Sequence, residues 1–95
     1  MNEAPRAARR EVVYRGHVQG VGFRFTVRSL AFQFRVTGYV ANLPDGGVRL
    51  IVEGESGETD RFLAAISAEM GDFIRETTVE ESPAQGEFQG FEIRR

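Results

Sequence analysis

Residues 16–24 read Gly-His-Val-Gln-Gly-Val-Gly-Phe-Arg, and this stretch joins a strand pattern to a helix pattern. Before it, apolar and polar side chains alternate over residues 11–18, which predicts a half-buried strand. The two glycines, Gly20 and Gly22, predict a tight turn. A helix is then expected over residues 22–34, because the apolar side chains recur with helical spacing. These are Phe23, Val27, Leu30, Ala31 and Phe34.

The rest of the chain continues to alternate between strand and helix patterns. A turn is expected at residues 43–47, and it has the composition of a β-hairpin turn because it contains Pro44, Asp45 and Gly46 in succession. Ser56 is the expected N-cap of the second helix, and Gly71 ends that helix. The further predicted elements are a strand at 36–42, a turn at 43–47, a strand at 48–55, a helix at 58–70, a strand at 74–81, a turn at 82–86 and a short strand at 88–94.

The order of these elements is β-α-β-β-α-β with an extra C-terminal strand. Two such units predict an α+β fold, the ferredoxin-like split βαβ, in which two helices cover one face of an antiparallel sheet. Right-handed crossovers make the first and third strands central neighbours. The other sheet face is expected to meet solvent. The predicted organisation is a flexible tail at residues 1–10 and a single domain at 11–95.

The composition excludes several kinds of chemistry. The chain has 95 residues, no cysteine and one histidine. A disulfide framework, a thiolate metal site and a cysteine nucleophile are therefore ruled out. All twelve basic residues are arginine, so the lysine of a Walker-type phosphate loop or of a Schiff-base enzyme is missing as well. We expect no cofactor and no metal.

Charge is distributed unevenly along the chain. Residues 1–35 carry a net charge of +5 and residues 36–95 a net charge of −7. A positive field near the glycine-rich stretch would attract an anion, although three of the arginines lie in the predicted tail. No apolar run reaches membrane length and no signal-peptide pattern opens the chain. We expect a cytoplasmic, monomeric protein that binds neither membranes nor nucleic acid.

The glycine-rich stretch has the properties of an anion-binding loop. Glycines allow consecutive backbone N–H groups to point into one concavity, and a helix N-terminus adds its own unpaired donors. Arg24 falls in the first helical turn, where its guanidinium can reach the same anion. The alternative is an ordinary glycine-rich turn with an arginine exposed to solvent.

Asn42 is the second candidate, at the end of the second strand. Gly38, Val40 and Asn42 share one side of that strand. A polar side chain on a core face needs a partner. The other interpretation, that Asn42 caps its own turn, is equally compatible with the spacing.

Together these two motifs resemble the acylphosphatase family, from about residue 11 to residue 95. The resemblance rests on Gly-x-Val-Gln-Gly-Val-Gly-Phe-Arg at 16–24 and Gly-Tyr-Val-Ala-Asn-Leu-Pro-Asp-Gly at 38–46. It implies hydrolysis of small acyl phosphates, with phosphate or sulfate as product-like ligands and no metal. It also implies that Arg24 and the loop residues bind the phosphoryl group, and that Asn42 holds the attacking water. The implied phosphate-binding residues are Gln19, Gly20, Val21, Gly22, Phe23 and Arg24.

Two other classes of protein share this order of elements or this kind of loop. RNA-recognition domains have the same order but place aromatic residues on the two central strands, and those strands show none on the face away from the helices. A non-catalytic binder of phosphorylated metabolites would keep the loop but has no use for a held water at Asn42.

Phe25 and Phe32 lie off the helix stripe and are candidates for a partner surface. Glu53 and Glu55 share a strand face, where a solvated edge is more plausible than an acid pair.

Overall fold

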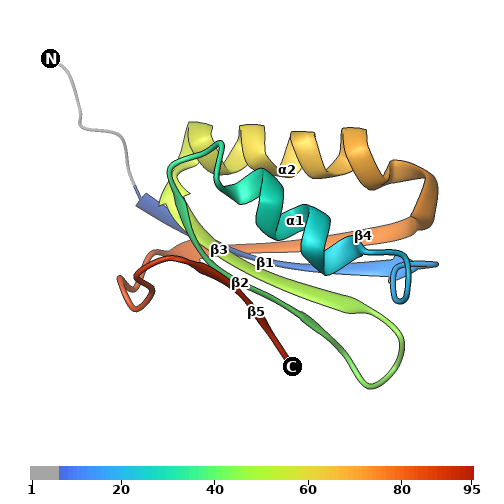
Figure 1. Cartoon of the computed structure of the whole chain (residues 1–95). Helices are drawn as coiled ribbons and strands as arrows, with labels where there is room; N and C mark the ends of the chain where they lie inside the picture. Colours follow the sequence, from blue (N-terminus) through green and yellow to red (C-terminus); the bar gives the residue numbers. More distant parts are fainter. Residues whose placement is uncertain (1–6) are drawn as a thin grey trace, which may run out of the picture.

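In the computed structural model, which describes residues 7–95, both helices lie on one face of a five-stranded sheet (Figure 1). None of the helices in this part of the chain has the length and apolar character that crossing a membrane requires. The elements are β1 (Ala7–Gly16), α1 (Phe23–Ala31), β2 (Val36–Asn42), β3 (Val48–Glu55), α2 (Ser56–Met70), a short 3-10 helix η1 (Gly71–Phe73), β4 (Ile74–Pro83) and β5 (Phe91–Arg94).

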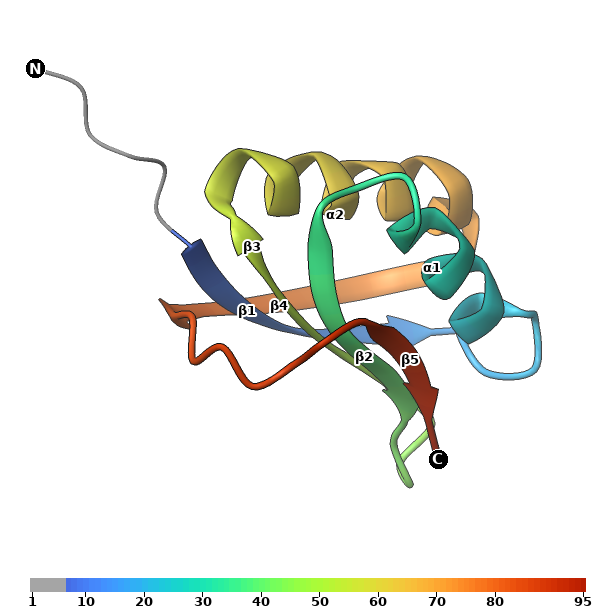
Figure 2. The ribbon, with the colours of Figure 1, turned by 60° about the vertical axis from the view of Figure 1, so that its left-hand side comes forward.

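The strands lie in the order β4-β1-β3-β2-β5, which confirms the predicted split βαβ fold with β1 beside β3. The first four strands pair antiparallel, but β5 pairs parallel to β2, so the sheet is mixed. The chain reverses direction after β4 and crosses to the far edge of the sheet (Figure 2). Because β2 already runs opposite to β4, the strand that arrives there is parallel to β2.

The first strand begins at Ala7, four residues before its predicted start at residue 11. Ala8 is buried and pairs with Gly54 on β3 and Pro83 on β4. Two of the three arginines that suggested a tail are instead paired: Arg9 with Glu53 and Arg10 with Asp60 and Glu81. Opposite charges on neighbouring elements therefore extend the strand into the predicted tail, of which residues 1–6 lie outside the described part of the chain.

Both helices have ends that differ from the predicted ones. The first helix stops at Ala31, and the backbone N–H of Phe34 then donates to the carbonyl of Ala31 in a tighter turn. The second helix is capped by the Glu55 carboxylate, not by the predicted Ser56. That carboxylate accepts hydrogen bonds of 3.0 Å from the backbone N–H groups of Gly57 and Glu58. A carboxylate at this end also complements the helix dipole.

The core lies between the helices and the sheet. It is formed by buried side chains of both helices and of the sheet. Aromatic contacts in and beside it include Tyr14–Phe23 and Phe34–Phe62, at centroid distances of 5.1 and 5.7 Å. Burying these apolar surfaces is the main favourable term in folding. The buried apolar residues that form this core are Val12, Tyr14, Val18, Phe23, Val27, Ala31, Val40, Val48, Leu50, Val52, Phe62, Ile66 and Met70.

The second face of the sheet is covered in part, contrary to the expectation that it would meet solvent. Residues 84–90, here called the crossing segment, run over this face from β4 to β5 (Figure 2). Glu53 is only 5% exposed and accepts 2.9 Å hydrogen bonds from the backbone N–H groups of Gln85 and Gly86. Arg9 donates to the same carboxylate at 3.1 Å. Glu53 is therefore a structural anchor rather than a solvated edge residue or half of an acid pair.

The Glu53 carboxylate is expected to contribute to the free energy of unfolding at neutral pH and to lose that contribution in acid. Burial alone raises the pKa of Glu53, but the two backbone hydrogen bonds and Arg9 outweigh it and lower the pKa below its ordinary 4.5. A depressed pKa stabilises the fold above pH 4.5, and that contribution is lost as the pH falls through the folded-state pKa. We expect Glu53→Gln to lower the free energy of unfolding by about 2 kcal/mol at neutral pH, because hydrogen bonds to a charged group are lost.

Urea denaturation of both proteins at several pH values measures this effect. The difference between wild type and Glu53→Gln should shrink as the solution is made more acidic. Glu87→Gln is the matched control, because Glu87 also pairs with Arg9 but is an exposed side chain on the crossing segment. A difference that stays constant from neutral to acidic pH would contradict the role assigned to the Glu53 charge.

Candidate active site

The loop between β1 and α1 is held at both ends by buried residues. Val18 is 1% exposed and Phe23 is 2% exposed, so the segment between them is fixed to the core. Gly20 and Gly22 have φ values of +80° and +77°, in the left-handed region that favours glycine. A Cβ at either position would meet no neighbouring atom within 4 Å. The backbone conformation, and not a lack of space, is therefore what requires glycine in this loop.

Helix α1 begins directly at this loop with unpaired backbone donors. The backbone N–H of Thr26 donates to the carbonyl of Gly22 at 3.0 Å, which closes the first helical turn. The N–H groups of Phe23, Arg24 and Phe25 precede that bond, and at such positions a helix offers no carbonyl to pair with. These donors, together with the positive end of the helix dipole, can bind an anion at the loop.

A cavity of about 200 Å³ lies at this helix N-terminus. It brings Arg24 and the two glycines of the loop to the same space as Asn42, which comes from the far end of β2. The lining residues are Val18, Gly20, Gly22, Phe23, Arg24, Phe25, Asn42 and Ile93. Loop, helix, β2 and β5 thus all contribute to one site.

Asn42 reaches the loop even though β3 separates β1 from β2 in the sheet. Helix α1 packs against β2 and β5, which places its N-terminus beside the end of β2. The Gln19 side chain adds a direct link, because its Nε2 donates hydrogen bonds of 2.8 Å to the carbonyls of Leu43 and Gly47. The turn that follows Asn42 is therefore fastened to the loop that precedes Arg24.

Arg24 is half-buried and is oriented by the C-terminal strand. Its Nη1 lies 3.4 Å from the backbone carbonyl oxygen of Arg94, at the end of β5. This contact occupies one donor of the guanidinium and leaves others for an anion. A single arginine at the edge of a backbone nest provides both charge and directional hydrogen bonds for a phosphoryl group.

The structure brings five of the seven predicted site residues together around the cavity. Gln19 and Val21 are not among the lining residues: the Gln19 side chain binds the neighbouring turn and Val21 packs against the core. The sequence interpretation also missed three apolar lining residues, Val18, Phe25 and Ile93. For Phe25 a signal existed, since it directly follows Arg24 in the first helical turn, whereas nothing in the sequence links Ile93 to this loop.

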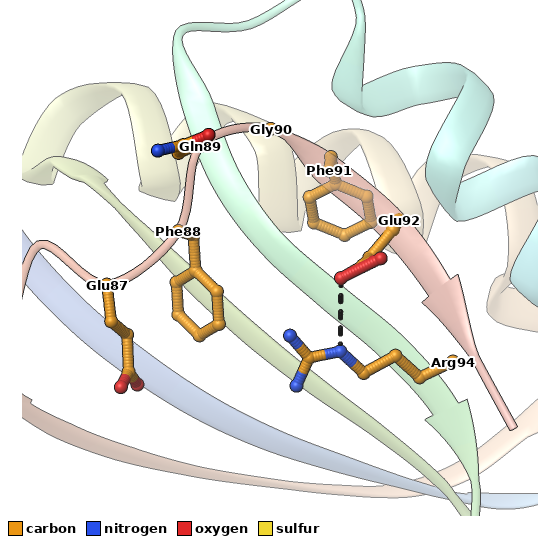
Figure 3. Close-up of a pocket in the computed structure, with 7 residues that line it drawn as sticks. All are labelled: Glu87, Phe88, Gln89, Gly90, Phe91, Glu92 and Arg94. Atoms are coloured by element: carbon orange, nitrogen blue, oxygen red, sulfur yellow. Dashed lines mark hydrogen bonds and ion pairs between the residues drawn. The ribbon is translucent and has the colours of Figure 1, made fainter.

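A larger, more open hollow of about 400 Å³ lies along residues 87–94 (Figure 3). Two of its walls are the carboxylates of Glu87 and Glu92, which would repel a phosphate. The Arg94 guanidinium is already engaged there. It lies 3.2 Å from Glu92 and stacks on the Tyr39 ring at 4.1 Å from the ring centroid. The two carboxylates therefore disfavour an anion in this hollow, whereas the described residues that line the cavity at α1 include Arg24 and no carboxylate.

Among residues 7–95, no group of three or more His, Asp or Glu side chains is arranged to hold a metal ion. His17 is exposed beside the loop and does not line the cavity. The side chains around the cavity instead offer one cation, one amide and an apolar wall. This arrangement can bind an anion, orient a water molecule and accommodate an apolar group.

The structure is thus a split βαβ domain of the α+β class, with a cavity at the N-terminus of its first helix that is lined by an arginine and an asparagine and is suited to an anion such as phosphate. The sequence profile described as Acylphosphatase matches residues 10–93. The chain belongs to the acylphosphatase family, a family of hydrolases, as the predicted resemblance indicated.

Individual relatives agree with this assignment. An acylphosphatase of Aeropyrum pernix is 41% identical over 88 residues, covering 90% of this chain and 87% of the relative. One from Rubrobacter xylanophilus is 39% identical over 95 residues, covering 99% and 86%. The crystal structure of acylphosphatase from Bacillus subtilis superposes with a TM-score of 0.83 at 27% identity, covering 93% of this chain and 99% of that one.

Proposed function

We propose that this chain hydrolyses the carboxyl–phosphate bond of small acyl phosphates in the cavity at the start of α1, without a metal ion. The products are a carboxylate and inorganic phosphate. The observation that carries the proposal is the single cavity lined by the glycine loop, Arg24 and Asn42. Membership in the acylphosphatase family supports the same reaction.

The chemistry of the substrate explains why so few groups suffice. An acyl phosphate is a mixed anhydride, and its leaving group is a carboxylate that departs without protonation. Phosphoryl transfer passes through a loose, anionic transition state, so catalysis depends on positioning and charge stabilisation. In our proposal the loop amides and Arg24 hold the phosphoryl oxygens and stabilise that charge.

Asn42 is proposed to position the attacking water. Its side-chain amide offers both a donor and an acceptor, which is what fixing one water orientation requires. Water attacks phosphorus, the bond from phosphorus to the acyl oxygen breaks, and the bonding pair leaves with the carboxylate. The proton of the water passes to a phosphoryl oxygen, so that no protein base is needed.

Replacing Asn42 should separate catalysis from binding. We expect Asn42→Ala to lower kcat about 100-fold, in the range seen when one positioned polar group is removed from an active site. The inhibition constant of inorganic phosphate should change by no more than about threefold, because the loop and Arg24 remain. Steady-state kinetics with phosphate as a competitive inhibitor measure both quantities. An equal loss of turnover and of phosphate affinity would refute the water-positioning role.

The reaction itself is tested with purified protein, acetyl phosphate and excess EDTA. The expected result is release of inorganic phosphate at an undiminished rate in the chelator, with competitive inhibition by added phosphate. Turnover that requires an added divalent cation would overturn the metal-independent mechanism. Binding of phosphate without any turnover would favour a module that only binds phosphorylated metabolites.

RNA binding is disfavoured by the covered sheet face. RNA-recognition domains use the face away from the helices. In this chain the crossing segment is hydrogen-bonded to Glu53 on that face, and Ile51 beside it is 2% exposed. We also propose that the protein is a monomer, as expected from the sequence. Light scattering coupled to size-exclusion chromatography tests the oligomeric state.

A further inference from the structure

The side chain of Gln19 joins the glycine loop to the turn between β2 and β3. Its Nε2 donates hydrogen bonds of 2.8 Å to the backbone carbonyls of Leu43 and Gly47. Because both partners are acceptors, the NH2 side of the amide must face them, and both of its protons are used. The Gln19 side chain therefore has no N–H left for a phosphate, and Gln19 does not line the cavity.

The two carbonyls that Gln19 binds are also the ones that close the turn. The Gly47 carbonyl accepts a hydrogen bond of 2.8 Å from the Leu43 N–H, and the Leu43 carbonyl accepts one of 3.2 Å from the Gly46 N–H. Leu43 directly follows Asn42, the last residue of β2. Gln19 therefore holds a turn that is closed by its own hydrogen bonds, and Asn42 is one peptide bond away from the point of attachment.

Pairing within the sheet connects Asn42 to the loop only indirectly. Strand β3 lies between β1 and β2, so the sheet fixes Asn42 relative to the loop through two successive strand pairs. The Gln19 amide spans the same gap with one side chain. Arg15 and Asp45 make a further link from β1 to the turn, an ion pair of 2.9 Å, but both side chains are about half exposed and such pairs are weak in water.

From these contacts we infer that Gln19 is a positioning residue. Its side chain sets the place of Asn42, and so of the attacking water, relative to the phosphoryl group at the loop. The inference rests on the proposed function, because it takes Asn42 to hold that water. A displacement of about 1 Å between reacting groups can cost about 100-fold in rate, so Gln19 contributes to kcat although its side chain does not touch the substrate.

The test uses Gln19→Met, which keeps the approximate length of the side chain but removes both donors. We expect kcat for acetyl phosphate to fall about tenfold, because the turn and Asn42 are then free to move away from the loop. The inhibition constant of inorganic phosphate should change by no more than about twofold, because the loop amides and Arg24 remain. Arg15→Ala is the matched control, since it removes the ion pair to the same turn and should change kcat by no more than about twofold.

A double-mutant cycle separates this positioning role from a merely structural one. If Gln19 acts through Asn42, Gln19→Met should change kcat by no more than about twofold when residue 42 is already alanine. A further loss of about tenfold in the Asn42→Ala background would overturn the inference. So would a weakening of phosphate binding that matches the loss of kcat, or an equal loss of kcat in Arg15→Ala.

Gln19→Asn keeps the test decisive if Gln19→Met does not fold. It retains an amide but is one methylene shorter, so it cannot reach both carbonyls and should show the same selective loss of kcat. Thermal unfolding verifies the fold of each variant. Unchanged kcat in folded Gln19→Met would overturn the role of Gln19 and leave the hydrolase intact, whereas a folded wild type that hydrolyses no acetyl phosphate would overturn the proposed function itself.

Discussion

Replacing Arg24 by alanine is expected to abolish acyl phosphate hydrolysis while leaving the fold unchanged. The guanidinium is the one charged group among the described residues that line the cavity, so its loss leaves the developing negative charge to the backbone amides alone. Arginines that stabilise phosphoryl-transfer transition states contribute about 1,000-fold or more to kcat. Arg24→Lys keeps the charge but not the planar fork, and should recover only part of the activity.

The control for this variant is Arg28→Ala. Arg28 is one turn further along the same helix, where it is exposed and its guanidinium lies over the Phe32 ring at 5.4 Å. Its removal should change kcat by no more than about twofold. Circular dichroism verifies that both variants are folded. Substantial turnover in folded Arg24→Ala would exclude the catalytic role given to Arg24.

Gly38→Ala should be the most destabilising single substitution considered. Gly38 lies in β2 with φ +145°, and a Cβ there would be 1.9 Å from the backbone carbonyl oxygen of Ile51 on β3. Backbone cannot move aside as a flexible side chain can, so β2 must shift away from β3. We expect a loss of at least about 4 kcal/mol in the free energy of unfolding, from a total stability of about 5–15 kcal/mol.

Gly90→Ala provides the comparison at the same place in the sheet. The carbonyl of Gly90 accepts the hydrogen bond of the Gly38 N–H at 2.9 Å, but a Cβ on Gly90 would meet nothing within 4 Å. It should alter stability by no more than about 0.5 kcal/mol. Thermal and urea unfolding measure both variants. If Gly38→Ala unfolded at the same temperature as wild type, the close approach of the two backbones would not be a constraint on the fold.

Much of the fold could be predicted from the sequence because local patterns and topology agree. The alternation before Gly16 and the helical stripe after Gly22 define β1 and α1, and the order of elements then leaves few arrangements for the sheet. The loop, Arg24 and Asn42 could likewise be identified, because the two motifs that contain them have the sequence and the spacing of the acylphosphatase family. Their catalytic roles stay predictions that the variants above test.

What the sequence did not indicate depends on contacts between distant segments. The extension of β1 to Ala7 follows from pairing with β3 and β4, whereas its arginines alone suggested a tail. Glu53 became an anchor only because the crossing segment, more than thirty residues later, supplies two N–H groups. Ile93 joins the cavity for the same reason, since β5 pairs with β2 after crossing the sheet. Local periodicity carries no information about such partners.

The most direct test of the account is to follow the oxygen of the attacking water. Hydrolysis of benzoyl phosphate in isotopically labelled water transfers the label either to phosphate or to benzoate, and mass spectrometry distinguishes the two. With the phosphoryl group held by the loop and Arg24 and the water held by Asn42, attack occurs at phosphorus, so the label is expected in inorganic phosphate. Label in benzoate would mean attack at the acyl carbon, and would contradict the placement of the phosphoryl group in this cavity.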